Sequence, residues 1–137
     1  MSKKIAVNQS TELAMKQMGE LITEIRGKRS LRKVAEPSGI PASQLQYIER
    51  GSMAPTAEVY PKLLNALRPD EKQRSKMDQL YMTIRKTPPP DVCEILISNP
   101  NLITVLRTME GAQLSKNEMN TLLKSIAQKK KGDTDNG

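Results

Sequence analysis

The sequence contains no histidine, phenylalanine or tryptophan, and it has one cysteine and three tyrosines. Without histidine and with a single thiol, the chain lacks the Cys/His sets that hold zinc and the His-dependent groups of many catalytic sites. It also has no glycine-rich phosphate loop and no nucleophile motif, and Cys93 lies in an apolar run where a core position is expected. We therefore predict a protein that is not an enzyme and that needs no metal or cofactor.

Long apolar runs are absent as well. The sequence opens with MSKKIAVNQS, which lacks the apolar core of a signal peptide. No apolar run approaches the roughly 20 residues that span a bilayer. These features predict a cytoplasmic protein without a membrane-spanning segment.

Positive charge exceeds negative charge in this sequence. It has 22 Lys and Arg against 15 Asp and Glu, for a formal net charge of +7. Such a balance favours an anionic partner such as nucleic acid. An ordinary solvated basic surface is the alternative, and charge alone does not decide between them.

Helices are the expected secondary structure, because aromatic residues and windows of alternating Val, Ile and Thr are scarce. Ser30 and Thr56 are predicted to cap helices, and Ser115 with Glu118 forms a capping box. A short helix is expected to open at Pro90 or Asp91. Apolar side chains recur at helical spacing within residues 15–25, 31–35, 45–48, 59–67, 77–84, 102–109 and 119–126.

One stretch, GIPASQLQYIERG at residues 39–51, combines a few apolar positions with a compact polar set. Ile40, Leu45 and Ile48 can face a core, which leaves the other side chains outside. Two short helices joined by a tight turn at EPSGIP have the features of a helix-turn-helix. In such a motif the polar side of the second helix enters the major groove of DNA.

These residues resemble the Cro and lambda-repressor helix-turn-helix proteins, often called the XRE family. The resemblance covers roughly residues 21–67, and its most specific part is SLRKVAEPSGIPASQLQYIERGSMAPTAEVYPKLLNAL. It implies an all-α fold in which a lambda-repressor-like helix-turn-helix domain is followed by a small C-terminal helical domain. The matching positions are Ser30, Val34, Ala35, Gly39, Ile40, Leu45, Ile48, Glu49, Arg50, Gly51, Pro55 and Leu67.

The resemblance and the apolar stripes together predict a domain organisation. We expect a flexible N-terminus at residues 1–14, the helix-turn-helix domain at 15–68 and a linking helix at 69–87. Residues 88–129 are expected to form a helical dimerisation or effector domain, and 130–137 a disordered tail. The prediction of a homodimer through the C-terminal helices depends on their apolar stripes, since helix-turn-helix proteins usually bind as dimers. A protein or peptide effector is the alternative partner of that domain.

The resemblance also implies which side chains contact double-stranded DNA. Base-reading residues would be Ala42, Ser43, Gln44, Gln46 and Tyr47. Glu49 is expected to brace the scaffold. Phosphate contacts would come from Arg26, Lys28, Arg29, Ser30, Arg32, Lys33, Arg50, Ser52 and Thr56.

Three positions depart from the family pattern. Leu31 stands where many members have a glutamine that binds phosphate, which predicts looser base readout. Pro41 stands where Ser or Thr usually caps the second helix, so the capping oxygen is missing. Pro37 removes one amide from the end of the first helix of the motif.

The implied function is a nucleoid-associated transcriptional repressor that binds an inverted-repeat operator as a dimer through residues 42–50. One alternative is an antitoxin-like or partner-binding protein whose helix-turn-helix regulates its own promoter. Another is a membrane-surface protein that uses the basic amphipathic segment LLKSIAQKKK, although this segment lacks Trp or Phe anchors.

Overall fold

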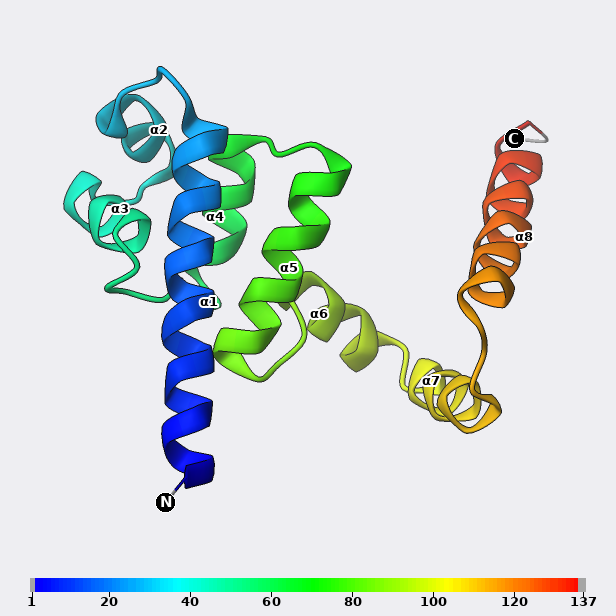
Figure 1. Cartoon of the computed structure of the whole chain (residues 1–137). Coiled ribbons are helices and arrows are strands. Elements are labelled where there is room, and N and C mark those ends of the chain that lie inside the picture. Colours follow the sequence, from blue (N-terminus) through cyan, green and yellow to red (C-terminus); the bar gives the residue numbers. More distant parts are fainter. Residues whose placement is uncertain (1, 136–137) are drawn as a thin grey trace. The chain divides into compact units, whose positions relative to one another are not determined.

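The computed structural model describes residues 2–135, with side chains described for residues 9–130. Within residues 2–135 the chain forms helices and no strand, which confirms the predicted all-α fold. The chain divides into two compact units, Met1–Glu94 and Ile95–Gly137, and the boundary falls within α6. The helices in this range are α1 (Ser2–Arg26), α2 (Leu31–Ser38), α3 (Ala42–Glu49), α4 (Val59–Leu67), α5 (Glu71–Arg85), α6 (Pro90–Ser98), α7 (Asn101–Ala112) and α8 (Lys116–Asp135) (Figure 1).

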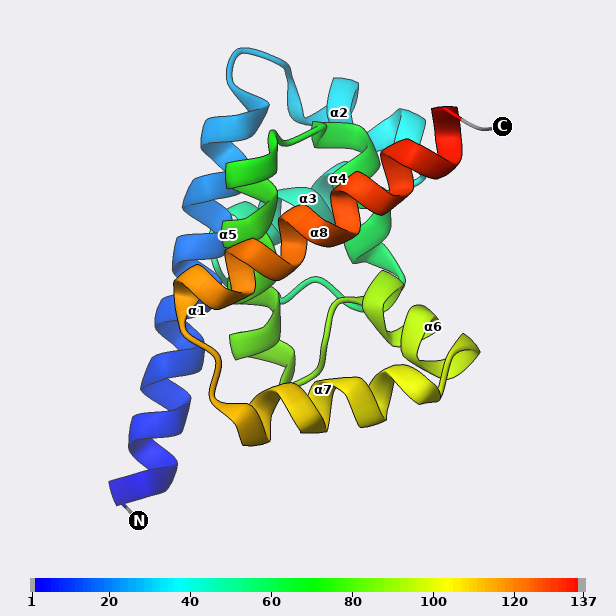
Figure 2. The same ribbon diagram turned by 90° about the vertical axis from the view of Figure 1, so that its right-hand side faces the viewer.

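The first unit holds the hydrophobic core. Helix α1 packs against α3 and α5, and α2 packs against α3 and α4. Figure 1 shows α1 running between α3 and α5, and the rotated view in Figure 2 shows α5 alongside α1. The largest fully buried side chains come from α1, α3, α4, α5 and the loop before α4: Met18, Ile22, Leu45, Ile48, Pro55, Tyr60, Leu63, Met77 and Tyr81.

The local signals around α2 and α3 are confirmed. The Ser30 hydroxyl accepts a hydrogen bond from the Lys33 amide at 3.1 Å and caps α2. Gly39, at φ 75°, ends α2 in the left-handed conformation that glycine adopts without strain. Pro41 precedes α3 and supplies no side-chain cap. Ile40, Leu45 and Ile48 are all buried, together with Val34 and Ala35 of α2.

Helix α5, within residues 69–87 where the sequence predicts a linking helix, packs against α1 in the core of the first unit. Its predicted stripe is buried at Met77, Leu80 and Tyr81. The rings of Tyr60 and Tyr81 stack with centroids 4.3 Å apart, and the Tyr60 hydroxyl donates to Asp78 Oδ1 at 2.6 Å. Burial raises the pKa of Tyr60 above its ordinary range, and the bond to Asp78 raises it further.

Both ends of the chain are more helical than expected. The N-terminus at residues 1–14 was predicted to be flexible, but α1 begins at Ser2 and Ala14 is only 4% exposed. The segment between Ser2 and Met18 contains neither Gly nor Pro, so nothing in it ends a helix. Helix α8 continues to Asp135, through most of the predicted tail at 130–137. Residues 1, 136 and 137 lie outside the described part.

The second unit contains helices but no buried side chain among its described residues. The capping box of α8 is confirmed: the Glu118 amide donates to the Ser115 hydroxyl, and the Ser115 amide donates to Glu118 Oε1, both at 3.1 Å. The bond from the Ser115 amide lowers the pKa of Glu118. The predicted apolar stripes of α7 and α8 are present, and none of their described side chains is buried.

Helix α6 likewise contains no buried side chain. Cys93 was expected in the core, and it is instead partly exposed. Its thiol donates to the Pro88 carbonyl at 3.4 Å. The apolar run around Cys93 therefore forms a helix, but its apolar side chains are not buried.

Gly19 marks the closest approach of two helices in the first unit. A Cβ atom at this position would lie 2.2 Å from the Glu49 carbonyl oxygen and 2.7 Å from that of Ile48. Gly51, at φ 78°, adjoins the same contact, where a Cβ would lie 2.9 Å from Lys16 Cα. Backbone therefore lies against backbone where α1 crosses the C-terminal end of α3.

We predict that Gly19→Ala lowers the free energy of unfolding by about 1–3 kcal/mol, because the added methyl group overlaps backbone that cannot rotate away. Gly111→Ala is the matched control, since a Cβ there meets no atom within 4 Å. That control should be neutral or stabilising by up to about 1 kcal/mol. Urea denaturation of the full chain measures both, and equal stability of the two variants would contradict the close contact.

Candidate nucleic-acid interface

Helix α3 presents polar side chains on the side that faces away from the core. Ser43, Gln46 and Tyr47 are exposed, Tyr47 by 48%, while Ala42 and Gln44 are half-buried. In the described part of the chain, the hydroxyl and amide groups of Ser43, Gln44 and Gln46 make no hydrogen bond with the protein. The structure thus gathers all five predicted base-reading residues on one short helix, with their polar groups available to a partner.

Four exposed cations accompany this helix: Lys28, Arg32, Lys33 and Arg50. No ion pair or hydrogen bond of their side chains occurs among the described residues. Lys33 also lines a hollow of about 520 Å³ between α2 and α4, together with Lys62 and Arg68, and no carboxylate lines it. Lys62 pairs with Glu58 at 3.7 Å, so the attraction for an anionic ligand comes from the exposed cations without such a partner.

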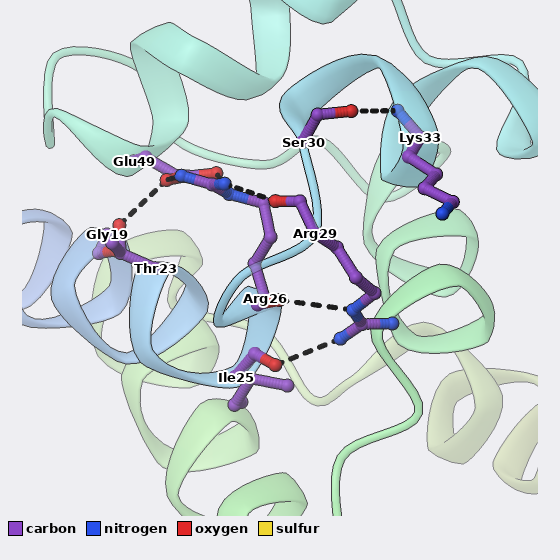
Figure 3. A network of polar contacts seen from close by, with 8 residues as sticks. All are labelled: Gly19, Thr23, Ile25, Arg26, Arg29, Ser30, Lys33 and Glu49. Carbon is purple, nitrogen blue, oxygen red and sulfur yellow. Dashed lines mark hydrogen bonds and ion pairs between the residues drawn. The ribbon is translucent and has the colours of Figure 1, made fainter.

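Arg26 and Glu49 form an ion pair that links the end of α1 to the end of α3 (Figure 3). Arg26 Nε donates to Glu49 Oε2 at 2.8 Å and Nη2 donates to Oε1 at 3.0 Å, while the Thr23 hydroxyl donates to Oε1 at 2.8 Å. The Glu49 side chain is 8% exposed and that of Arg26 is 18% exposed. The bond to Glu49 raises the pKa of the guanidinium. This geometry favours a structural role for Arg26 over the expected phosphate contact, and it agrees with the bracing role expected of Glu49.

Arg29 is also engaged within the protein. Its guanidinium donates to the carbonyls of Ile25 at 2.9 Å and Arg26 at 3.1 Å, as Figure 3 shows. Longer contacts of 3.4 Å reach the carbonyls of Ala66 and Leu67. Arg29 therefore satisfies carbonyls at the C-terminal ends of both α1 and α4, where a cation is favoured. This geometry favours a structural role for Arg29 over the expected phosphate contact.

The three hydroxyl groups expected at phosphates differ in what they can still donate. Ser30 and Thr56 each accept from a backbone amide, at Lys33 and at Val59, so their hydroxyl protons stay available. Ser52 instead donates its proton to the Tyr47 carbonyl at 3.1 Å. The geometry is therefore compatible with phosphate contacts from Ser30 and Thr56, and it argues against one from Ser52.

Two supporting residues were missed by sequence reasoning. Gly19 allows the close crossing of α1 and α3, and Arg85 Nε donates to the carbonyl of the buried Pro55 at 3.0 Å. The second bond ties the loop that follows α3 to the end of α5. Neither residue carries a local signal, because each contact joins segments far apart in the sequence.

Comparison of the chain with protein-family models, curated proteins and solved structures finds no match. Residues 2–135 contain no helix with both the length and the hydropathy of a bilayer span. The same residues contain no cluster of three or more Cys, Asp or Glu side chains that could hold a metal ion. The interpretation of this surface as a candidate nucleic-acid interface therefore rests on the polar side of α3 and its neighbouring cations.

We predict that Arg26→Ala lowers the free energy of unfolding by about 2–3 kcal/mol, because it leaves the largely buried Glu49 carboxylate without its ion-pair partner. Arg32→Ala removes the same group from an exposed position and should change stability by no more than about 0.5 kcal/mol. Guanidinium denaturation compares the two. A loss for Arg26→Ala as small as that for Arg32→Ala would show that the ion pair does not brace the fold.

Proposed function

We propose that this chain is a sequence-specific transcriptional regulator that binds double-stranded DNA through α3, which we call the reading helix. The observation that carries the proposal is the polar side of the reading helix, whose donors and acceptors have no partner in the protein, beside four exposed and unpaired cations. In this proposal α2 and α3 form the helix-turn-helix of a lambda-repressor-like domain.

Base recognition would come from the first two turns of the reading helix. A glutamine amide can pair with adenine through two hydrogen bonds, which suits Gln44 and the more exposed Gln46. Ser43 can donate to or accept from several bases, and the Ala42 methyl can contact that of thymine. Tyr47, at the second turn, can stack on a sugar and donate to phosphate.

Phosphate contacts would hold the reading helix in register. Lys28, Arg32 and Lys33 lie around the start of α2, and Arg50 follows α3. The Thr56 hydroxyl and the amides of Met53, Ala54 and Thr56 offer further donors on the far side of the groove, whereas the amides of Gly51 and Ser52 already donate to carbonyls of α3. These contacts supply affinity without sequence preference, so they should dominate the dependence on salt.

A regulator of this kind would act as a dimer on an inverted repeat, with two reading helices in successive major grooves roughly 34 Å apart. Repression would follow from exclusion of polymerase. A second candidate is a partner-binding protein that regulates its own promoter, and the uncovered apolar stripes of α7 and α8 favour it.

The function is tested by selecting bound fragments from genomic DNA and titrating the best site against a scrambled site by fluorescence anisotropy. A preference of at least about 10³-fold for an inverted repeat is expected of a specific regulator. Equal binding to both sites would contradict sequence-specific regulation.

We predict that Gln44→Ala reduces the preference for the selected site by about 10-fold or more at one or two base positions, because bidentate pairing with a base is worth about 1–3 kcal/mol. Gln79→Ala, on the exposed side of α5, is the matched control and should change nothing. Anisotropy titrations on single-base variants of the site measure the effect. Equal losses on specific and scrambled DNA would rule out a base contact by Gln44.

We predict that Lys33→Ala weakens binding to all DNA sequences alike and lowers the slope of log K against log salt by about one, because one phosphate contact is lost. Lys72→Ala removes an exposed lysine from α5 and should leave the slope unchanged. Titrations at several salt concentrations give the slopes. An unchanged slope for Lys33→Ala would place this lysine outside the interface.

A further inference from the structure

The hollow between α2 and α4 is lined by positive charge. Among the described residues, none that lines it is Asp or Glu. Like charges gathered around one hollow repel each other unless an anion lies among them, so this hollow is a candidate anion site. We call it the basic hollow, and four of its nine lining residues are cations: Arg29, Lys33, Lys62 and Arg68.

Contacts within the protein leave most of this charge uncompensated. The Arg29 guanidinium donates to backbone carbonyls, which are uncharged groups, so it keeps its positive charge. Lys62 pairs with Glu58 at 3.7 Å, but the two side chains are 41% and 83% exposed, and such a surface pair is weak. The side chains of Lys33 and Arg68 make no hydrogen bond or ion pair among the described residues. An anionic ligand would therefore meet little competition from the carboxylates of the protein.

The size and lining of the basic hollow suit a small molecule with more than one charged group. Its volume of about 520 Å³ falls within the roughly 300–1,000 Å³ of typical small-molecule pockets. Lys62 on α4 and Arg68 at its end are separated by about 9 Å along the helix axis, which fits a diphosphate better than a single phosphate. Val34, Pro37 and Ala66 add apolar atoms to the lining, which can contact an organic group.

The DNA backbone is the other source of phosphate for these cations, because Lys33 belongs to both the basic hollow and the proposed interface. The reading helix, however, contributes no residue to the lining, and two of the four cations lie on α4 or at its end. DNA phosphates lie on the outside of a convex double helix, whereas a hollow between two helices admits a small molecule. A free organic phosphate is therefore the ligand that the geometry favours.

We propose that the basic hollow binds a small organic diphosphate, such as a nucleoside diphosphate. The phosphates would lie among the four cations and the organic group against the apolar part of the lining. A diphosphate bound to Lys33 would keep this lysine from a DNA phosphate, so the ligand would weaken DNA binding and DNA would weaken ligand binding by the same factor. This regulatory consequence rests on the proposed function, whereas the binding itself does not.

Equilibrium dialysis of the full chain against ADP, without DNA and without divalent cations, tests the site. We expect one ADP to bind per chain with a Kd below about 1 mM at low salt. Lys62→Gln and Arg68→Asn should each raise the Kd by about 5-fold or more, because a charge-assisted hydrogen bond to phosphate is lost. Asparagine is chosen at position 68 because Arg68, at φ 52°, has the left-handed conformation that asparagine tolerates.

Two further variants separate a formed site from general charge attraction. Asn65→Tyr fills the basic hollow without a change of charge and should raise the Kd for ADP by about 10-fold or more. Lys76→Gln is the matched control for charge: it removes an exposed lysine of α5 outside the hollow and should change the Kd by less than about 2-fold. Circular dichroism shows whether each variant keeps its helices.

No binding of ADP at millimolar concentration would overturn the proposal, as would equal losses for Lys62→Gln and Lys76→Gln or unchanged binding by a folded Asn65→Tyr. If ADP does not bind, but Lys62→Gln and Arg68→Asn lower the affinity for DNA, the cations belong to the DNA interface instead. Anisotropy titration of the selected DNA with ADP present tests the regulatory consequence, and an unchanged Kd for DNA would contradict it. ADP binding by a chain without DNA preference would support the site and contradict the proposed function alone.

Discussion

The crossing of α1 over the C-terminal end of α3 is the contact on which the rest of the first unit depends. An isolated helix of eight residues is not stable in water, so α3 takes its position from what it packs against. Gly19 lets the backbones meet, and the Arg26 guanidinium holds the Glu49 carboxylate beside them. Because Leu45 and Ile48 are buried, the polar side of α3 faces away from the core.

The cations between Arg26 and Lys33 divide into two roles, structural and exposed. Helices α1 and α4 both end near Arg29, and their last carbonyls need donors that the backbone does not supply. Arg29 provides these donors, and Arg26 pairs with Glu49, so both guanidinium groups already have partners within the protein. Among the described residues, the side chains of Lys28, Arg32 and Lys33 make no hydrogen bond or ion pair. From sequence spacing alone, the five cations are equivalent candidates for phosphate contacts: Arg26, Lys28, Arg29, Arg32 and Lys33. The structure distinguishes two of them, because Arg26 and Arg29 bind groups at the ends of helices.

The sequence predicted what is encoded locally. The caps at Ser30 and Ser115, the left-handed end at Gly39 and the buried stripes of α1 to α5 follow from residue type and helical spacing, and the structure has them. Contacts between distant segments were not predictable in this way. In the sequence, nothing distinguishes Gly19 from another helix residue, and its role is clear only from the Glu49 backbone that lies against it. Likewise, the sequence of α5 suggests a linker, and its place in the core is clear only from the stacking of Tyr81 on Tyr60. In the candidate site, the exposed residues of α3 were found from the sequence, and the structural role of Arg26 was not.

The C-terminal helices show the limit of periodicity most directly. A stripe at helical spacing predicts that a face will be covered, but not whether the covering residues belong to the same chain. Pro88, Pro89 and Pro90 restrict the backbone before α6, and the ion pair of Arg74 with Asp91, at 3.0 Å, holds the start of α6 to α5. In the proposed dimer the distance between the two reading helices would depend on this connection between α5 and α6. A substitution at Arg74 would then alter the spacing of half-sites that the protein selects without touching DNA.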